Sequence, residues 1–147
     1  MDIALEYNPD ERIFDLIIKG GDLATDEGLE TAVILSLFTD RRAEEDDDLP
    51  GGSSDRRGWW ADAYFDRPHG SRLWLLGREK EQDSVLRRAK TYADEALQWL
   101  VDDGVAKEVV VDAEHVRRGV LGIDVSIRRG SGADLERQYE YVWDAIA

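Results

Sequence analysis

The sequence predicts an α+β fold in which strands precede and follow a helical middle. Three observations lead to this prediction: alternating apolar residues near the N-terminus, a helical apolar pattern over residues 84–101, and strict alternation again from residue 121. Strands that occur in blocks favour antiparallel sheets over a parallel βαβ sheet. The length of 147 residues suits one domain, residues 1–147, and we find no internal repeat.

The N-terminal residues have the pattern of a β-hairpin. Ile3, Leu5 and Tyr7 alternate with polar or small residues, and residues 8–11 (Asn-Pro-Asp-Glu) have turn composition. The alternation resumes with Phe14, Leu16 and Ile18. The glycine pair at residues 20–21 is expected to end this hairpin.

A first helix is expected to begin near Leu29 and to continue to Phe38. Thr25 and Asp26 are the candidates for its N-cap. The segment is apolar nearly all round, which predicts burial on several faces, although a buried strand is an alternative for so short a run.

Residues 39–70 lack periodicity and predict a long loop. Residues 44–48 are five consecutive acids, residues 49–54 are turn-rich, and residues 66–70 form another cluster of helix and strand breakers. A loop of about 30 residues inside a compact domain suggests a function, a binding arm or local disorder. We expect residues 42–54 to be mobile, because the acids repel one another and Pro-Gly-Gly-Ser-Ser supplies no apolar anchor.

Two further helices are expected after the loop. Residues 71–76 form a short apolar segment that Gly77 closes, and a longer helix begins at Asp83 or Ser84 and stops at Gly104. Its apolar residues recur at spacings of three and four and build one face, which should form the main part of the core. They are Val85, Leu86, Ala89, Tyr92, Ala93, Ala96, Leu97, Leu100 and Val101.

The C-terminal part predicts three antiparallel strands. The first contains Val109 and Val111, and turns are expected at residues 117–119 and 129–132. The alternating residues of the other two strands are Leu121, Ile123, Val125 and Ile127, then Tyr139, Tyr141 and Trp143.

Composition excludes several classes of function. A net charge of −14 repels nucleic acid and anionic membranes. No apolar run is long enough to cross a membrane, and the Met1-Asp2-Ile3 start lacks a signal segment, so we expect synthesis and residence in the cytosol. There is no cysteine and only two histidines, His69 and His115, so we predict no metal site and no cofactor.

Catalytic motifs have no positive support. The acidic block does not match the spacing of an EF-hand, and a solvated flexible run is the more common role of such a block. Carboxylate pairs such as Glu6 and Asp15 arise by chance in so acidic a chain, whereas a glycosidase needs two carboxylates in unlike environments. We therefore predict that the protein is not an enzyme.

Arginine pairs and a tryptophan pair are the candidate protein-interaction residues. Arginine suits bidentate contacts with carboxylates, and tryptophan and arginine are enriched in interface hot spots. Two alternatives stay open: that the arginines are ordinary solvated charges, and that one indole plugs the end of the core. The predicted residues are Arg41, Arg42, Arg56, Arg57, Trp59 and Trp60.

Five strings in order resemble a known family, the baseplate wedge proteins of Mu-like phages named for gene product forty-six. They are residues 22–26 (DLATD), 29–33 (LETAV), 36–43 (SLFTDRRA), 55–60 (DRRGWW) and 96–100 (ALQWL). The resemblance runs from about residue 22 to residue 104 and is looser in the final strands. Ala61 stands where the family is expected to have glycine.

The resemblance implies a structural subunit in the baseplate wedge of a contractile phage tail, related in role to the lysozyme-like small wedge protein of T-even phages. The implied partners are the larger baseplate wedge protein, other baseplate subunits and further copies of the chain. The implied location is the virion tail baseplate, and the host bacterial cytoplasm during assembly. It implies no catalytic residue. Two alternatives remain: a peptidoglycan-cleaving tail enzyme, and an acidic inhibitor or immunity-type protein that acts on a basic toxin.

Overall fold

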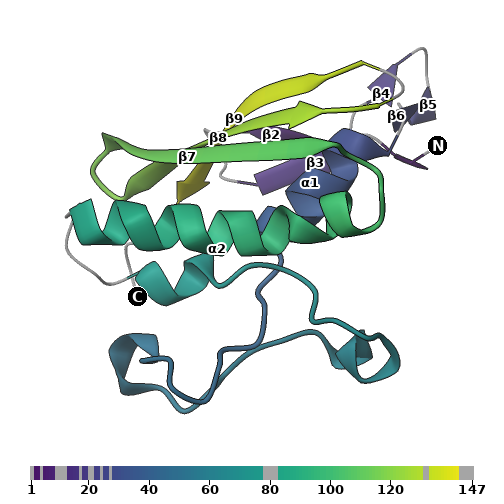
Figure 1. Ribbon diagram of the computed structural model, residues 1–147. Helices are drawn as coiled ribbons and strands as arrows, with labels where there is room; N and C mark the ends of the chain where they lie inside the picture. The colour runs from purple at the N-terminus through teal and green to yellow at the C-terminus, as the bar shows by residue number, and fades with distance from the viewer. Residues whose placement is uncertain are drawn as a thin grey trace. The chain divides into compact units, whose positions relative to one another are not determined.

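The computed structural model describes residues 28–77, 83–130 and 133–142, together with the backbone of six short N-terminal strands (Figure 1). The chain separates into two compact units, residues 1–35 and 36–147, and helix α1 (Leu29–Phe38) runs across their boundary. The single domain over residues 1–147 stays a prediction.

The N-terminal unit contains three antiparallel strand pairs. β2 (Leu5–Asn8) pairs with β3 (Ile13–Leu16), with Leu5 opposite Leu16 and Tyr7 opposite Phe14, which confirms the predicted hairpin. β4 (Ile18–Lys19) pairs with β5 (Asp22–Leu23), and β1 (Asp2–Ile3) pairs with β6 (Thr25–Asp26). The predicted turn and the glycine pair at residues 20–21 lie mostly or wholly outside the described residues.

Helix α1 begins and ends as expected, but its N-cap differs. The carbonyl of Gly28 accepts the N–H of Ala32 at 2.9 Å, so Gly28 occupies the N-cap position. The prediction that Thr25 or Asp26 caps the helix is wrong, because both residues belong to β6. Burial on several faces is confirmed: Val33, Ile34, Leu37 and others are buried, whereas Leu35 is exposed.

The long helix α2 (Asp83–Asp102) matches the predicted helix. Its predicted apolar face is buried except for Leu86 and Val101, which are half-buried. At its C-terminus Gly104 adopts a positive φ of 76°, and the N–H of Asp103 donates to the carbonyl of Trp99 at 2.9 Å. This is the helix stop expected from Gly104.

The C-terminal strands form one antiparallel sheet in the order β7-β8-β9. The strands are β7 (Glu108–Arg117), β8 (Val120–Arg128) and β9 (Leu135–Val142). One face of the sheet lies along α2, and its residues, such as Val111, Ile123 and Tyr139, are buried (Figure 1). The three predicted strands are confirmed, although Trp143 lies outside the described residues.

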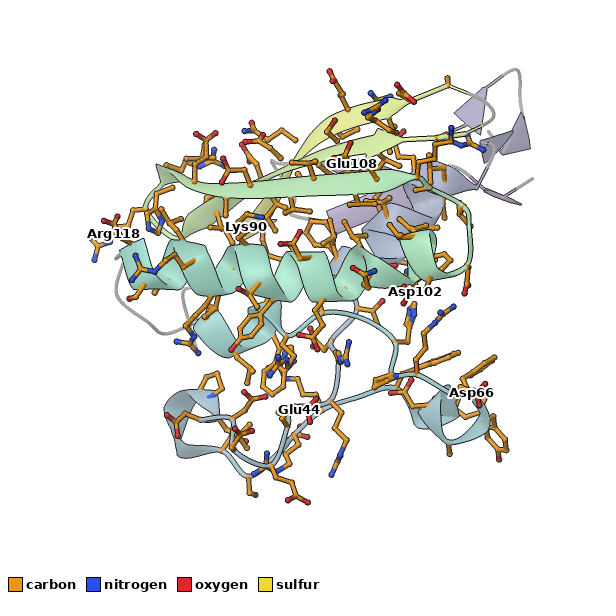
Figure 2. All side chains as sticks on the ribbon, in the orientation of Figure 1. Glu44, Asp66, Lys90, Asp102, Glu108 and Arg118 are labelled. Carbon is orange, nitrogen blue, oxygen red and sulfur yellow. The ribbon has the colours of Figure 1, made fainter. Side chains whose placement is uncertain are left out.

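The middle of the chain contains a short helix and the predicted long loop. Leu73–Leu76 form a 3₁₀ helix in which all four side chains are buried, as the apolar segment predicted. The loop, residues 39–70, contains only two short 3₁₀ helices, Pro50–Gly52 and Trp60–Tyr64. Below, these residues are called the arm; Figure 2 labels Glu44 and Asp66 on it.

Candidate functional site

The two ends of the arm meet at one place. Asp40 and Ser71 form a parallel bridge, in which the Arg41 N–H donates to the Ser71 carbonyl at 3.0 Å and the Ser71 N–H donates to the Thr39 carbonyl at 2.8 Å. The buried Ser71 hydroxyl donates to the carbonyl of Leu37 at 2.6 Å. Gly70 has a φ of 101°, and a Cβ at this position would clash with the Thr39 carbonyl. The base of the arm therefore requires glycine at position 70.

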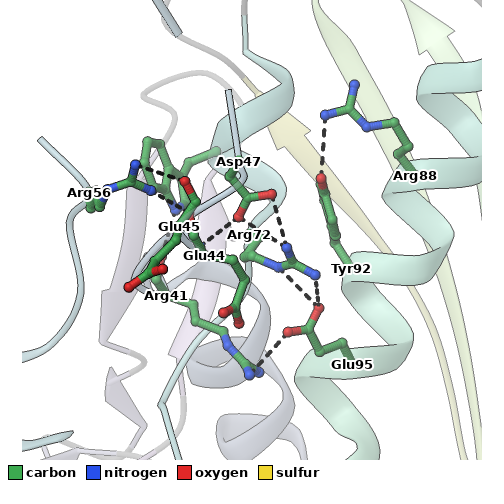
Figure 3. Close-up of polar contacts among 10 residues, drawn as sticks. Arg41, Glu44, Glu45, Asp47, Arg56, Arg72, Arg88, Tyr92 and Glu95 are labelled. Atoms are coloured by element: carbon green, nitrogen blue, oxygen red, sulfur yellow. Dashed lines mark hydrogen bonds and ion pairs between the residues drawn. The ribbon is translucent and has the colours of Figure 1, made fainter. Parts of the chain in front are cut away.

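A network of ion pairs ties the arm to helix α2 (Figure 3). The Arg72 guanidinium donates to Asp47 in the arm at 3.0 Å and to Glu95 on α2 at 2.8 Å. Arg41 also pairs with Glu95, at 3.1 Å. The side chains of Arg41 and Arg72 are each 16% exposed, so this network is better shielded from solvent than an ordinary surface pair.

Arg72 keeps its charge in this partly buried place. Burial alone would lower the pKa of Arg72, but the hydrogen bonds to Glu95 and Asp47 outweigh it and raise this pKa above its ordinary value. The guanidinium also lies 4.6 Å from the centre of the Tyr92 ring, a cation–π distance. Arg72 is thus fixed by two carboxylates and one aromatic face.

Backbone carbonyls inside the arm accept hydrogen bonds from Arg42 and Arg56. Arg56 donates to the carbonyls of Glu44 and Glu45, and its own carbonyl accepts the N–H of buried Ala43 at 2.8 Å. Arg42 donates to the carbonyl of Arg57 at 3.3 Å. These contacts hold the outgoing and returning halves of the arm together.

Trp74 is a second point at which the arm is held. Its indole N–H donates to the Arg41 carbonyl at 2.8 Å, and the Arg57 guanidinium lies 4.4 Å from the centre of its ring. Arg57 also pairs with Asp40 at 2.7 Å. Trp74 is 5% exposed, so Arg57 covers a core residue from outside.

Four exposed aromatic residues gather around the 3₁₀ helix Trp60–Tyr64. The exposed fractions are 37% for Trp59, 79% for Trp60, 79% for Tyr64 and 61% for Phe65. Trp59 stacks on Phe65 with ring centres 5.7 Å apart and lies 5.3 Å from the His69 ring, while Trp60 meets Tyr64 edge-on at 6.3 Å. Below, these four residues are called the aromatic patch.

Polar contacts hold the segment that carries the patch. Asp62 accepts the N–H of His69 at 3.0 Å. Arg67 donates to both carboxylate oxygens of Asp103, at 3.0 and 2.5 Å, and its guanidinium lies 5.4 Å from the Trp99 ring. Because Asp103 directly follows α2, this pair fixes the arm to the end of that helix.

The predicted interaction residues have different environments in the structure. Trp59 and Trp60 lie side by side on the exposed patch, so neither indole plugs the core. Arg41, Arg42, Arg56 and Arg57 all lie in the arm, and each donates to an acceptor within the chain. Their intramolecular contacts give them a role in shaping the arm.

Sequence reasoning did not single out several important residues. Tyr64 and Phe65 extend the patch, and the signal for them was a second pair of adjacent aromatics five residues after the tryptophans. Asp47 is the member of the acidic block that pairs with Arg72, so the expectation of a merely solvated acidic run is wrong for this residue. Nothing local in the sequence distinguishes Asp47 from its neighbours.

The described residues give no site for metal chemistry. They contain no group of three or more histidine or acidic residues placed to hold a metal ion. Within the same residues no helix is long and apolar enough to cross a membrane. Glu6 and Asp15 occupy paired register positions in β2 and β3, but register alone does not give two carboxylates the unlike environments that glycosidase chemistry needs.

Comparison with known proteins identifies relatives over most of the chain. A family model described as phage protein GP46 matches residues 29–134. The baseplate protein gp46 of Escherichia phage Mu is 45% identical over 132 residues, which cover 90% of this chain and 91% of that protein. The Mu-like prophage FluMu protein gp46 of Haemophilus influenzae is 39% identical over 143 residues, 97% of each chain.

Proposed function

The chain belongs to the family of phage protein GP46 and is a structural subunit of the phage baseplate; from that premise we propose that it acts by docking its arm on neighbouring chains of a contractile tail. Its relative in phage Mu is named a baseplate protein, and the likeness covers nine-tenths of the chain. The proposed partners are the larger baseplate wedge protein, other baseplate subunits and further copies of the chain.

The aromatic patch is the observation that supports this proposal. A soluble protein rarely leaves several large aromatic side chains exposed together unless the surface binds something. Trp60 and Tyr64 are each 79% exposed and Phe65 is 61% exposed, so their apolar area is available for burial against a partner. Tryptophan and tyrosine are the residue types most enriched in interface hot spots.

The attachment of the arm supports the same role. The ion pairs of Arg72 with Asp47 and Glu95, and of Arg67 with Asp103, fix the arm at points before and after the patch. A surface that is held in its binding geometry loses less conformational entropy on association.

The experiment that tests docking is the double substitution Trp59→Ala/Trp60→Ala. We expect it to weaken binding to the purified larger wedge protein of the same phage by about 2 kcal/mol or more, because at least one interface anchor is lost. Affinity is measured by biolayer interferometry, and folding by a circular-dichroism melt. Val110→Ala, which trims an exposed apolar residue on the sheet, is the control and should bind normally.

Two results would contradict docking through the patch. One is unchanged affinity of the double variant. The other is normal binding with a sharply lower melting temperature, since that would mean that the indoles stabilise the arm and do not bind a partner.

A non-catalytic role is part of the same proposal. Incubation with purified peptidoglycan should release no soluble fragments, as followed by turbidity. Cleavage that disappears in Glu6→Gln or Asp15→Asn would instead support the peptidoglycan-cleaving alternative.

A further inference from the structure

The surroundings of the aromatic patch are acidic. Asp62 and Asp66 lie in the same short segment as Trp60, Tyr64 and Phe65. Where this segment meets the end of α2, Asp102 and Asp103 add two more carboxylates, and both act on the charge of Arg67. Within residues 60–67 and 102–103, four carboxylates therefore accompany one cation, Arg67.

The cation beside the patch is already neutralised. Both terminal nitrogens of Arg67 donate to the two oxygens of Asp103. This hydrogen bonding raises the pKa of Arg67 and lowers that of Asp103, as expected for a matched ion pair. The net local charge that a partner meets is thus set by Asp62, Asp66 and Asp102.

The other arginines of the arm make contacts within the chain. Arg57 pairs with Asp40 and lies over Trp74, and Arg41 pairs with Glu95. The guanidiniums of Arg42 and Arg56 donate to backbone carbonyls of the arm. The segment at residues 60–67 consequently presents aromatic faces with acidic side chains around them.

From this arrangement we propose that the patch docks on a basic surface: an apolar pocket on a different baseplate chain, rimmed by lysine and arginine side chains. The inference rests on the proposed function and adds the chemistry of the partner. Opposite charges around an apolar contact favour encounter and fix its orientation. The exposed faces of Trp60 and Tyr64 also offer cation–π contacts to basic side chains within about 6 Å.

A second copy of this chain does not fit that description. The chain carries a net charge of −14, so two patches brought together would oppose carboxylate to carboxylate. The partner surface is therefore assigned to another chain, not to self-association.

The test compares two charge reversals that change the net charge equally. Asp66→Lys places a cation beside the patch, and Glu136→Lys makes the same change on exposed strand β9. Binding to the purified larger wedge protein is measured at low and at moderate salt. We expect Asp66→Lys to weaken binding about tenfold, mainly in the association rate, and Glu136→Lys to change it less than about twofold.

Salt and a milder variant provide the remaining readouts. A higher salt concentration should weaken binding by the wild type and should weaken binding by Asp66→Lys less, because the reversed charge no longer contributes attraction to the partner. Asp66→Asn should bind with intermediate affinity, and it replaces Asp66→Lys if that variant fails to fold in a circular-dichroism melt.

The outcomes separate the two proposals. If Trp59→Ala/Trp60→Ala loses binding while Asp66→Lys and Glu136→Lys behave alike, the basic partner surface is wrong and docking through the patch stands. If neither the aromatic nor the Asp66 variants lose affinity, docking itself is wrong. A dimer in native mass spectrometry that disappears in Trp60→Ala would also overturn the inference, because it would make a second copy the occupant.

Discussion

Arg72 and Glu95 are joined by two hydrogen bonds, from Nε and Nη2 of the guanidinium to Oε2 of the carboxylate, at 3.2 and 2.8 Å. Arg72 lies two residues after the arm, and Glu95 lies on the central part of α2. Because the same guanidinium also holds Asp47, this residue pair fixes the acidic block to the long helix α2.

Replacing Arg72 by Ala should destabilise the protein by about 3 kcal/mol, because Asp47 loses its partner in a poorly solvated place and Glu95 keeps only Arg41. Urea denaturation measures the loss. Arg67→Ala removes a second bidentate pair, but an exposed one, and should cost far less. Equal losses of unfolding free energy in the two variants would show that the Arg72 network is no better shielded from solvent than the exposed Arg67 pair.

The pKa of Asp103 should lie below its usual value of 3.8, because Arg67 donates hydrogen bonds to the carboxylate. A lowered pKa in the folded state means that the stabilisation is present above the usual pKa and is lost as the pH falls through the folded value. Carboxyl-carbon NMR titration measures it. In Arg67→Gln the Asp103 pKa should rise, whereas Arg42→Gln should leave it where it was.

Gly70→Ala should be destabilising at the base of the arm. Its φ of 101° disfavours any side chain, and the new Cβ would meet the carbonyl of Thr39. Gly52→Ala is a matched control, since Gly52 also has a positive φ of 70° but has open space around it. Thermal denaturation should show a larger fall in melting temperature for Gly70→Ala than for Gly52→Ala. Equal falls would indicate that the loss of stability comes from backbone strain alone and not from the close approach of the Thr39 carbonyl.

Leu97→Ala should cost about 2–5 kcal/mol through lost burial and a residual cavity, because Leu97 is completely buried in the core. Arg87→Ala, on the exposed side of the same helix, should change the free energy of unfolding much less. Chemical denaturation of both variants compares them. A similar cost at both positions would mean that the buried face of α2 has been assigned incorrectly.

Mobility of residues 42–54 stays a prediction, and the contacts of the arm restrict it to residues 48–54. Ala43 is buried and its N–H donates to the Arg56 carbonyl, and Asp47 is held by Arg72, whereas the backbone N–H of Ser53 donates only over a long 3.5 Å to the Pro50 carbonyl. Hydrogen exchange should therefore be slow at Ala43 and fast at Ser53 and Ser54. Uniform protection across the segment would refute this division.

The regular elements could be predicted because their signals are local. Strict alternation from Leu121 to Ile127 assigned the buried face of β8, and apolar spacing in α2 assigned residues that are in fact buried. The pattern failed at Thr25 and Asp26, which have good N-cap chemistry but pair with β1 instead. There a strand partner more than twenty residues away outweighed the local preference.

The geometry of the arm could not be predicted, since its contacts join distant residues. Asp47 and Arg72 are 25 positions apart, and Arg67 and Asp103 are 36 apart. The sequence did single out the exposed tryptophans, because adjacent tryptophans beside arginines in a loop are typical of interface residues. It could not show that the arginines beside them are occupied with carbonyls and carboxylates of the chain itself.

The arm is a closed loop, because residues 39–41 at its start are hydrogen-bonded to Ser71 just after its end. The entropy of closing such a loop grows only slowly with its length, by about 0.6 kcal/mol for each doubling. Insertions near its tip, at residues 48–54, should therefore be tolerated as long as the bridge at its base and the Arg72 contacts are kept. The arm can therefore change in length at residues 48–54 while its base and its attachment to α2 stay the same.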